Sequence, residues 1–99
     1  LQLIHESGYV YNDLKFHNIM LQNQNEAVII DFGFATPCLD SNGNHISNQK
    51  EVDAFRGNLL FSSLNQMHFG STSRKDDLIS LLYLMMFCLN DFSISFLCD

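Results

Sequence analysis

The clearest pattern in the sequence is an apolar run of twelve residues, 78–89, which only Ser80 interrupts. A charged cluster at residues 74–77 comes directly before it. The pattern predicts a helix over about residues 76–90. Because a helix that is apolar on all sides is normally central to a core, we expect it to be buried under surrounding layers of protein. A bilayer span needs about 20 apolar residues, so the run does not predict membrane insertion.

Shorter apolar stretches occur in the first part of the chain. Residues 1–6 carry apolar side chains at helical spacing, and Gly8 follows them, which predicts the end of a helix. Residues 9–11 are strand formers and lead into a polar stretch, 12–18. We expect this polar stretch to be an ordered loop of the kind that often carries chemistry.

The middle of the chain predicts a hairpin and a long irregular segment. Two apolar runs, 19–21 and 27–30, are separated by the turn-forming residues 22–25. Residues 36–53 are polar and show no apolar period, which is typical of a functional or mobile loop. The predicted fold class is therefore α+β, mainly α, with a short β-hairpin and a long buried central helix.

Composition and charge narrow the class of protein. The chain has 99 residues, of which 46% are hydrophobic and 16% charged, and this indicates at most one globular domain. A net charge of −6 argues against binding to nucleic acid or to an anionic membrane. Cys38, Cys88 and Cys98 form no C-x-x-C pair, and no secretory signal is visible, so we expect an intracellular protein, cytoplasmic or nuclear. The first residue is Leu1, and we expect the true start to lie upstream.

Two polar motifs carry the candidate chemistry. Residues 13–18 fit the pattern D-x-K-x-x-N, and Asp31-Phe32-Gly33 follows, with the two aspartates 18 positions apart. Six such residues coincide by chance about once in 10⁸ placements. The motifs resemble the catalytic loop and the D-F-G loop of protein kinases. Each residue alone has an ordinary explanation as a turn, a cap or a surface charge, and only the joint pattern favours the kinase interpretation.

The resemblance implies roles for the catalytic-loop residues. Phosphoryl transfer needs a base near the attacking hydroxyl, a positive charge on the moving phosphate and oxygen ligands for Mg²⁺. Asp13 would accept or orient the proton of the substrate hydroxyl. Lys15 would place its ammonium near the γ-phosphate of ATP, and Asn18 would offer an oxygen to a second magnesium ion.

The D-F-G loop would complete the metal site. Asp31 would bridge the metal ions and the phosphates of ATP. Phe32 is expected to pack into the core and so to position the loop. Gly33, which has no Cβ, is expected to let the backbone turn sharply after the metal ligand.

A second resemblance, to the casein kinase I group, covers the later half of the chain. The sequence around Phe55-Arg56-Gly57-Asn58 and the triplet Ser63-Leu64-Asn65 are similar to the end of that group's activation segment, and residues 73–81 are similar to the start of its central helix. Asp77 aligns with the aspartate that ties this helix to the catalytic-loop backbone, a role in which a buried carboxylate accepts N–H groups.

The two resemblances together imply a partial protein kinase domain over residues 1–99. It would be a fragment of the large C-terminal lobe, without the N-terminal lobe and the later helices of the large lobe. Its parts would be a catalytic loop at about 11–18, the D-F-G loop at 31–33, an activation segment at about 31–65 and the central helix at about 76–90.

Several residues depart from the kinase pattern. Tyr11-Asn12 stands where most kinases have His-Arg, and that arginine usually pairs with a phosphorylated activation loop. We therefore expect activity here not to depend on loop phosphorylation. Asn58 replaces a threonine and Leu60 replaces an arginine of the casein kinase I pattern, which leaves a preference for phosphorylated substrates open. Leu82 replaces a small glycine and suggests repacking.

The leading interpretation is a protein kinase that transfers the γ-phosphate of ATP, with Mg²⁺, to serine or threonine hydroxyls of a protein substrate. A noncatalytic kinase-like scaffold and a truncated product without function are the alternatives. The isolated fragment is expected to bind ATP poorly, because the glycine-rich loop, the strand lysine and the helix glutamate of kinases are not among these residues.

Overall fold

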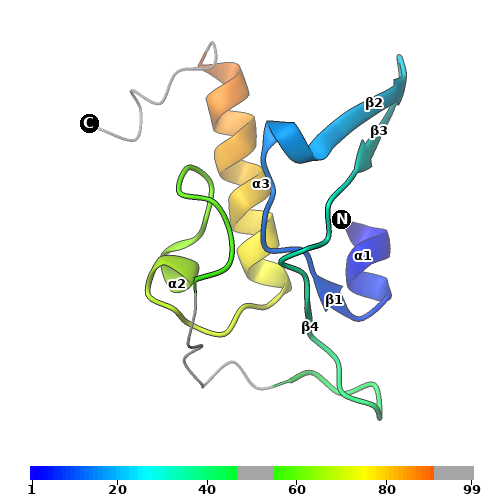
Figure 1. The fold of residues 1–99 in the computed structure, drawn as a ribbon, viewed down its shortest axis with the longest axis vertical. Coiled ribbons are helices and arrows are strands. Elements are labelled where there is room, and N and C mark those ends of the chain that lie inside the picture. The colour runs from blue at the N-terminus through cyan, green and yellow to red at the C-terminus, as the bar shows by residue number, and fades with distance from the viewer. Residues whose placement is uncertain (47–54, 91–99) are drawn as a thin grey trace.

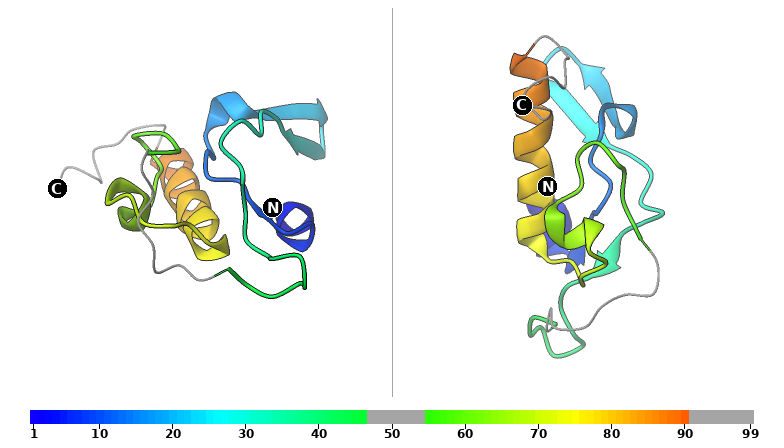
Figure 2. Two further views of the ribbon diagram at one scale, coloured as in Figure 1. Left: turned by 60° about the horizontal axis from the view of Figure 1, so that its bottom comes forward. Right: turned by 90° about the vertical axis from the view of Figure 1, so that its left-hand side faces the viewer.

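Helix α3, Arg74–Leu89, runs along the middle of the computed structural model, which describes residues 1–46 and 55–90 (Figure 1). The segment 55–73 lies on one side of α3, and the elements of the first half of the chain lie on the other (Figures 1 and 2). The helix begins two residues before the predicted start, because the Asp76 carboxylate accepts a hydrogen bond of 2.8 Å from the backbone N–H of Ser73 and so caps the first turn.

The prediction that this helix is buried is wrong for the described residues. Leu84 is 4% exposed, but Leu78 is 56% and Leu89 84% exposed, and Leu82, Met85 and Met86 also lie open. The physical reason is the thinness of the molecule, whose extents are 42 × 35 × 18 Å (Figure 2). A helix with its side chains is about 10–12 Å across, so 18 Å leaves no room for cover on all sides.

The first half of the chain begins with helix α1, Gln2–Glu6, and turns into strand β1, Tyr9–Val10. Gly8 makes this turn in the left-handed region, at φ +92°, where a glycine carries no steric penalty. Strand β1 pairs antiparallel with β4, Thr36–Pro37, with Val10 opposite Thr36. The sequence predicted an irregular segment over residues 36–53. It contains β4 and a bridge between Leu39 and His45, and residues 47–53 lie outside the described part of the chain.

The predicted hairpin is present and joins the two motifs. A short 3₁₀ helix, η1, spans Phe16–Asn18 and leads into β2, Ile19–Asn23, which pairs antiparallel with β3, Glu26–Ile29. The α+β class with short antiparallel sheets is thereby confirmed. No helix among the described residues is long and apolar enough to cross a membrane.

Polar residues outnumber hydrophobic ones among the buried residues of the described part of the chain.

Helix α2, Leu64–Met67, is a single turn that the sequence did not predict. It is capped by Ser63, whose hydroxyl accepts the backbone N–H of Gln66 at 3.1 Å while the Gln66 side chain accepts the backbone N–H of Ser63 at 3.0 Å. The same hydroxyl donates to the Asp76 carboxylate at 2.6 Å. These bonds attach α2 to the start of α3.

Candidate active site

The Asp13 carboxylate lies at the centre of a set of buried amides. Asp13 follows β1 in the stretch 11–14, where the side chains are all buried. One carboxylate oxygen accepts a hydrogen bond of 3.0 Å from the side-chain amide of Asn18, and the other accepts one of 3.2 Å from the amide of Asn58. Both amides also donate to backbone carbonyls of the same loop, Asn18 to Asp13 at 3.0 Å and Asn58 to Leu14 at 2.9 Å. The carboxylate is therefore held in one orientation.

The hairpin brings Asn18 beside the D-F-G loop. The backbone carbonyl of Asn18 accepts a hydrogen bond of 2.8 Å from the N–H of Ile30, the residue before Asp31. Asn18 is itself buried, because η1 turns its side chain back toward Asp13. Asp13, Asn18 and Asp31 thus come from one continuous hydrogen-bonded unit, although they are distant in sequence.

Asp31 is exposed, and its backbone lies in the left-handed region at φ +61°. One carboxylate oxygen accepts the N–H of Gly33 at 3.1 Å, and the other has no hydrogen-bond partner among the described residues. The backbone turns at residues 33–34, directly after Asp31, as expected for Gly33, and the left-handed backbone angle lies at Asp31 itself. A Cβ at Gly33 would lie 3.1 Å from the Asp31 carboxylate, a close approach that would require the side chain of Asp31 to shift.

Phe32 does not pack into the core, contrary to prediction. It is 52% exposed, and its ring meets Tyr11 edge-on, with centroids 5.4 Å apart. Phe32 also lines an open hollow of about 450 Å³ together with Leu3, Ile4 and Ala35. The described residues provide no more cover for this ring.

Tyr11 is fully buried beneath the loop. Its hydroxyl donates to the backbone carbonyl of Ile30, which gives a second link between the 11–18 loop and the residues before Asp31. Burial raises the pKa of Tyr11 to about 12, and the charges of Asp13 and Asp31 act in the same direction. The phenol therefore stays protonated, and keeps its donor role, throughout the physiological range.

Lys15 is the least constrained of the predicted site residues. It lies between the buried Leu14 and the start of η1, and its side chain is half-buried. In the part of the chain that the structure describes, its ammonium makes no ion pair. The group is free to meet an anion.

Asp77 ties α3 to the loop that carries Asp13. Its carboxylate, 1% exposed, accepts the backbone N–H groups of Tyr11 at 2.7 Å and Asn12 at 2.8 Å. It also contacts the Nε2 atom of His5 at 2.7 Å. A buried carboxylate that accepts this many N–H groups is satisfied rather than strained.

Sequence reasoning missed two contributors. Asn58 was treated only as a replaced threonine, but its amide bonds Asp13 from 45 positions away. Gln66 was not singled out, yet its side-chain amide donates to the carbonyls of Asn12 at 2.9 Å and Arg56 at 3.0 Å. Nothing in the local sequence of either residue marks these long-range contacts, and the only available signal was an unusual amide where a hydroxyl is typical.

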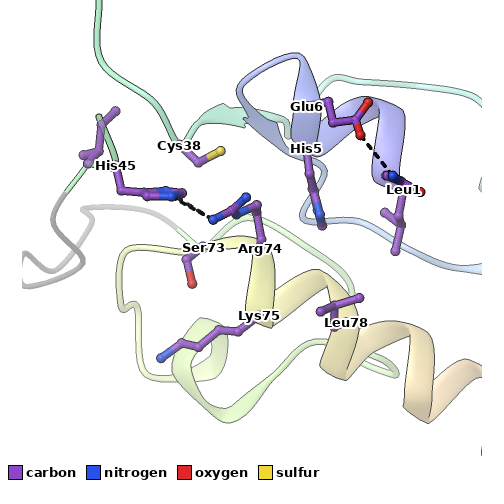
Figure 3. A pocket seen from close by; sticks show the side chains of 11 residues that line it. Leu1, His5, Glu6, Cys38, His45, Ser73, Arg74, Lys75 and Leu78 are labelled. Carbon is purple, nitrogen blue, oxygen red and sulfur yellow. Dashed lines mark hydrogen bonds between the residues drawn. The ribbon is translucent and has the colours of Figure 1, made fainter. Parts of the chain in front are cut away.

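Another hollow of the described surface is lined by none of Asp13, Lys15, Asn18 and Asp31. It has a volume of about 740 Å³, and its lining includes His5, Cys38, His45, Arg74 and Leu78 (Figure 3). Arg74 and His45 form a hydrogen bond of 2.8 Å across it. No member of the predicted site lines this hollow, so size alone does not locate the chemistry in this chain.

Residues of the D-x-K-x-x-N and D-F-G motifs thus lie in one hydrogen-bonded unit. The sequence pattern of the protein kinase domain family matches residues 1–85, and the chain belongs to this family.

Its curated relatives include casein kinase I homologues, which confirms the predicted resemblance. The chain is 34% identical over 86 residues to a probable casein kinase I homologue of Encephalitozoon cuniculi, and 34% identical over 94 residues to a casein kinase 1-like protein of Oryza sativa subsp. japonica. It is also 34% identical over 87 residues to a probable serine/threonine-protein kinase of fowlpox virus. The alignments cover 87%, 88% and 87% of the chain, but 27%, 13% and 30% of the relatives. The chain thus spans less than a third of the length of these relatives.

Proposed function

We propose that the complete protein is a protein kinase that transfers the γ-phosphate of ATP to serine or threonine hydroxyls, and that residues 1–99 form part of the large C-terminal lobe of its kinase domain. The observation that carries the proposal is the Asp13 carboxylate held between the amides of Asn18 and Asn58. A general base needs a fixed orientation toward the proton that it accepts, and two amide donors provide it.

The remaining roles follow from charge and exposure. Lys15 carries a cation two positions after Asp13 that makes no ion pair with the described residues, and there it would offset the negative charge of the phosphate that moves. Asp77 is structural in this proposal, because its carboxylate is buried and is occupied by the backbone N–H groups of Tyr11 and Asn12 and by His5.

ATP and Mg²⁺ would be the cofactors, and Asp31 and Asn18 would hold the metal. The described residues contain no group of three or more His, Cys, Asp or Glu side chains that could hold a metal ion by themselves. Mg²⁺ is commonly bound by one or two carboxylates together with nucleotide phosphates and water. Asp31 is exposed, and one of its carboxylate oxygens has no partner within residues 1–46 and 55–90, which fits that mode of binding. Bound there, the metal would neutralise charge on the phosphates of ATP.

The apolar surface supports a larger kinase domain around this chain. Five apolar residues of α3 are at least 41% exposed, and Phe32 is open toward α1. Exposed apolar area of this kind on neighbouring elements is typical of a surface that another part of a protein covers. In this proposal the catalytic loop is residues 11–18, the D-F-G loop 31–33, the activation segment about 31–65 and the central helix 76–90. Phosphate-covering elements would come from other parts of the protein.

The proposal also covers where the protein acts and what it meets. Kinase family membership implies a protein substrate, and the net charge of −6 disfavours a nucleic acid partner. We propose an intracellular site of action, cytoplasmic or nuclear, because ATP is the donor.

The test is phosphate transfer from ATP to a serine-containing peptide by the complete protein, with and without Mg²⁺. Asp13→Asn should lower kcat by about 10³-fold or more while Mg²⁺-dependent ATP binding persists, because the variant loses a base but no phosphate contact. Asp31→Asn should instead lose Mg²⁺-dependent binding. Asp40→Asn, a change of the same chemistry in an exposed loop, serves as the control. Equal activity in the wild-type protein and in Asp13→Asn would overturn the proposal.

A further inference from the structure

Asn12, the residue before Asp13, is buried and lies in the left-handed region, with 2% exposure and φ +74°. Its side-chain amide donates two hydrogen bonds to the segment after the D-F-G loop, at 2.7 Å to the backbone carbonyl of Phe34 and at 2.9 Å to the Thr36 hydroxyl. Asparagine adopts this backbone angle more readily than most other non-glycine residues, and here its hydrogen bonds hold it. The side-chain contacts of Asn12 identify a purpose for that angle.

The backbone of Asn12 is held just as firmly. Its N–H donates to the Asp77 carboxylate at 2.8 Å, and its carbonyl accepts the Gln66 amide at 2.9 Å. Asn12 therefore joins α3, α2 and the segment that follows Asp31. A side chain anchored in this way can fix the position of that segment relative to Asp13.

The partners of the Asn12 amide are neutral. They are a carbonyl oxygen and a hydroxyl oxygen, so they need a donor but no charge. The Asn12 side-chain oxygen is buried with no hydrogen-bond partner among the described residues. Asn12 also lines a small polar pocket of about 110 Å³ with Thr36, Gln66 and Thr72, at which Arg56 is the one cation among the lining residues. A phosphate group presents acceptor oxygens, and the unpaired Asn12 oxygen is also an acceptor. The two groups are therefore a poor match.

We propose that Asn12 is a positioning residue that fastens the segment after Asp31 to the Asp13 loop through a neutral amide, so that Asp13 and Asp31 keep their relative placement without a phosphate group on the chain. This inference rests on the proposed kinase function and adds a means of regulation to it. The Asn12 side chain links the Asp13 loop to the segment after Asp31 at all times. A charged residue at position 12 would need a phosphate group as its partner.

The first test is hydrogen exchange, which does not depend on activity. Asn12→Ala should raise the exchange rates of the backbone amides of Phe34, Ala35, Thr36 and Cys38 by about 30-fold, since two neutral hydrogen bonds are lost. The amides of the β2–β3 hairpin should keep their rates. Asn42→Ala, an amide removed from an exposed loop, is the matched control. Unchanged exchange at residues 34–38 in Asn12→Ala would overturn the inference even if the protein proves to be a kinase.

The second test uses the complete protein and asks whether position 12 requires a neutral amide or a charged group. Thr36→Val removes one partner of Asn12, so its effect on the KM for ATP should shrink markedly in the Asn12→Ala background. Asn12→Arg should lower kcat/KM by about tenfold or more, because the guanidinium must be buried against neutral partners. Phosphatase treatment should change kcat/KM by less than twofold.

Two results would contradict the inference. One is a gain of activity in Asn12→Arg, which would mean that position 12 works better with a charged guanidinium than with a neutral amide. The other is loss of most activity on phosphatase treatment, with Arg56→Gln showing the same loss, which would place a phosphate at Arg56. Absence of activity above Asp13→Asn in the wild-type protein would remove the proposed function and leave the exchange test of the Asn12 contacts intact.

Discussion

Replacing Asp77 by asparagine tests how the centre of the molecule is held. The Asp77 carboxylate accepts the backbone N–H groups of Tyr11 and Asn12 and contacts His5, all within 2.8 Å. Asparagine is nearly the same shape, but it keeps one acceptor oxygen and puts an NH₂ group where the other oxygen was. One backbone N–H is then buried and unpaired, and the other loses a charged acceptor.

The magnitude follows from hydrogen-bond energetics. A hydrogen bond to a charged group contributes about 1.5–3 kcal/mol, and a buried unpaired N–H costs about 1–3 kcal/mol. We therefore expect Asp77→Asn to lower the free energy of unfolding by about 3–5 kcal/mol. A chain of this length has about 5–15 kcal/mol in total, so the loss is a large part of its stability.

Urea unfolding followed by circular dichroism measures the change. The midpoint should fall by about 2–3 M, given a slope of about 1.5 kcal/mol per molar urea. Asp40→Asn is the matched control, because the exposed Asp40 carboxylate also accepts two backbone N–H groups, of Asn42 and Asn44 at 2.9 Å. It should cost less than about 1 kcal/mol. If Asp77→Asn costs no more than Asp40→Asn, burial is not what gives Asp77 its importance and the reasoning is refuted.

Three further predictions concern stability. Burial raises the Tyr11 pKa from 10.0 to about 12, so between these pH values the folded protein binds more protons than the unfolded chain. The free energy of unfolding should therefore fall as pH rises from about 10 to 12. In urea titrations, Tyr11→Phe should lose that part of the pH dependence. Gly57→Ala should lower the free energy of unfolding by about 2 kcal/mol or more, because φ is +145° and a Cβ would lie 2.5 Å from the Ser62 hydroxyl oxygen. Gly43→Ala meets no atom within 4 Å, so it carries backbone strain alone and should cost about 1 kcal/mol. Leu84→Ala should cost about 2–5 kcal/mol and Leu89→Ala about 0.5 kcal/mol or less by the same measurement, and equal costs would show that Leu89 is covered.

The sequence predicted those helices and strands whose apolar and turn residues lie close together along the chain. The helix at residues 74–89 and the hairpin at 19–29 follow from apolar runs and turn residues close together in the sequence. Strand β4 could not be found in this way, because its two residues become a strand only by pairing with β1. Helix α2 is too short for any period and depends on its capping residues.

Burial and side-chain contacts depended on the arrangement of the whole chain. The apolar run of α3 predicted a buried helix, and this prediction was wrong because exposure depends on how many neighbouring elements cover the helix, which the sequence of the run does not encode. The motif residues Asp13 and Asn18 could be named from spacing, whereas the contact of Asn58 with Asp13 joins residues 45 positions apart. The side-chain contacts of Asn12 span 22 and 24 positions and were hidden for the same reason.

The measurement that tests the central claim most directly is the single-turnover rate of phosphate transfer by the complete protein with ATP and Mg²⁺ already bound. This rate isolates the chemical step from nucleotide binding and product release. We predict transfer to a serine or threonine hydroxyl that falls by about 10³-fold in Asp13→Asn and is unchanged in Asp40→Asn. A wild-type rate that equals the rate of Asp13→Asn would contradict the account and would leave the chain as a kinase fold without kinase chemistry.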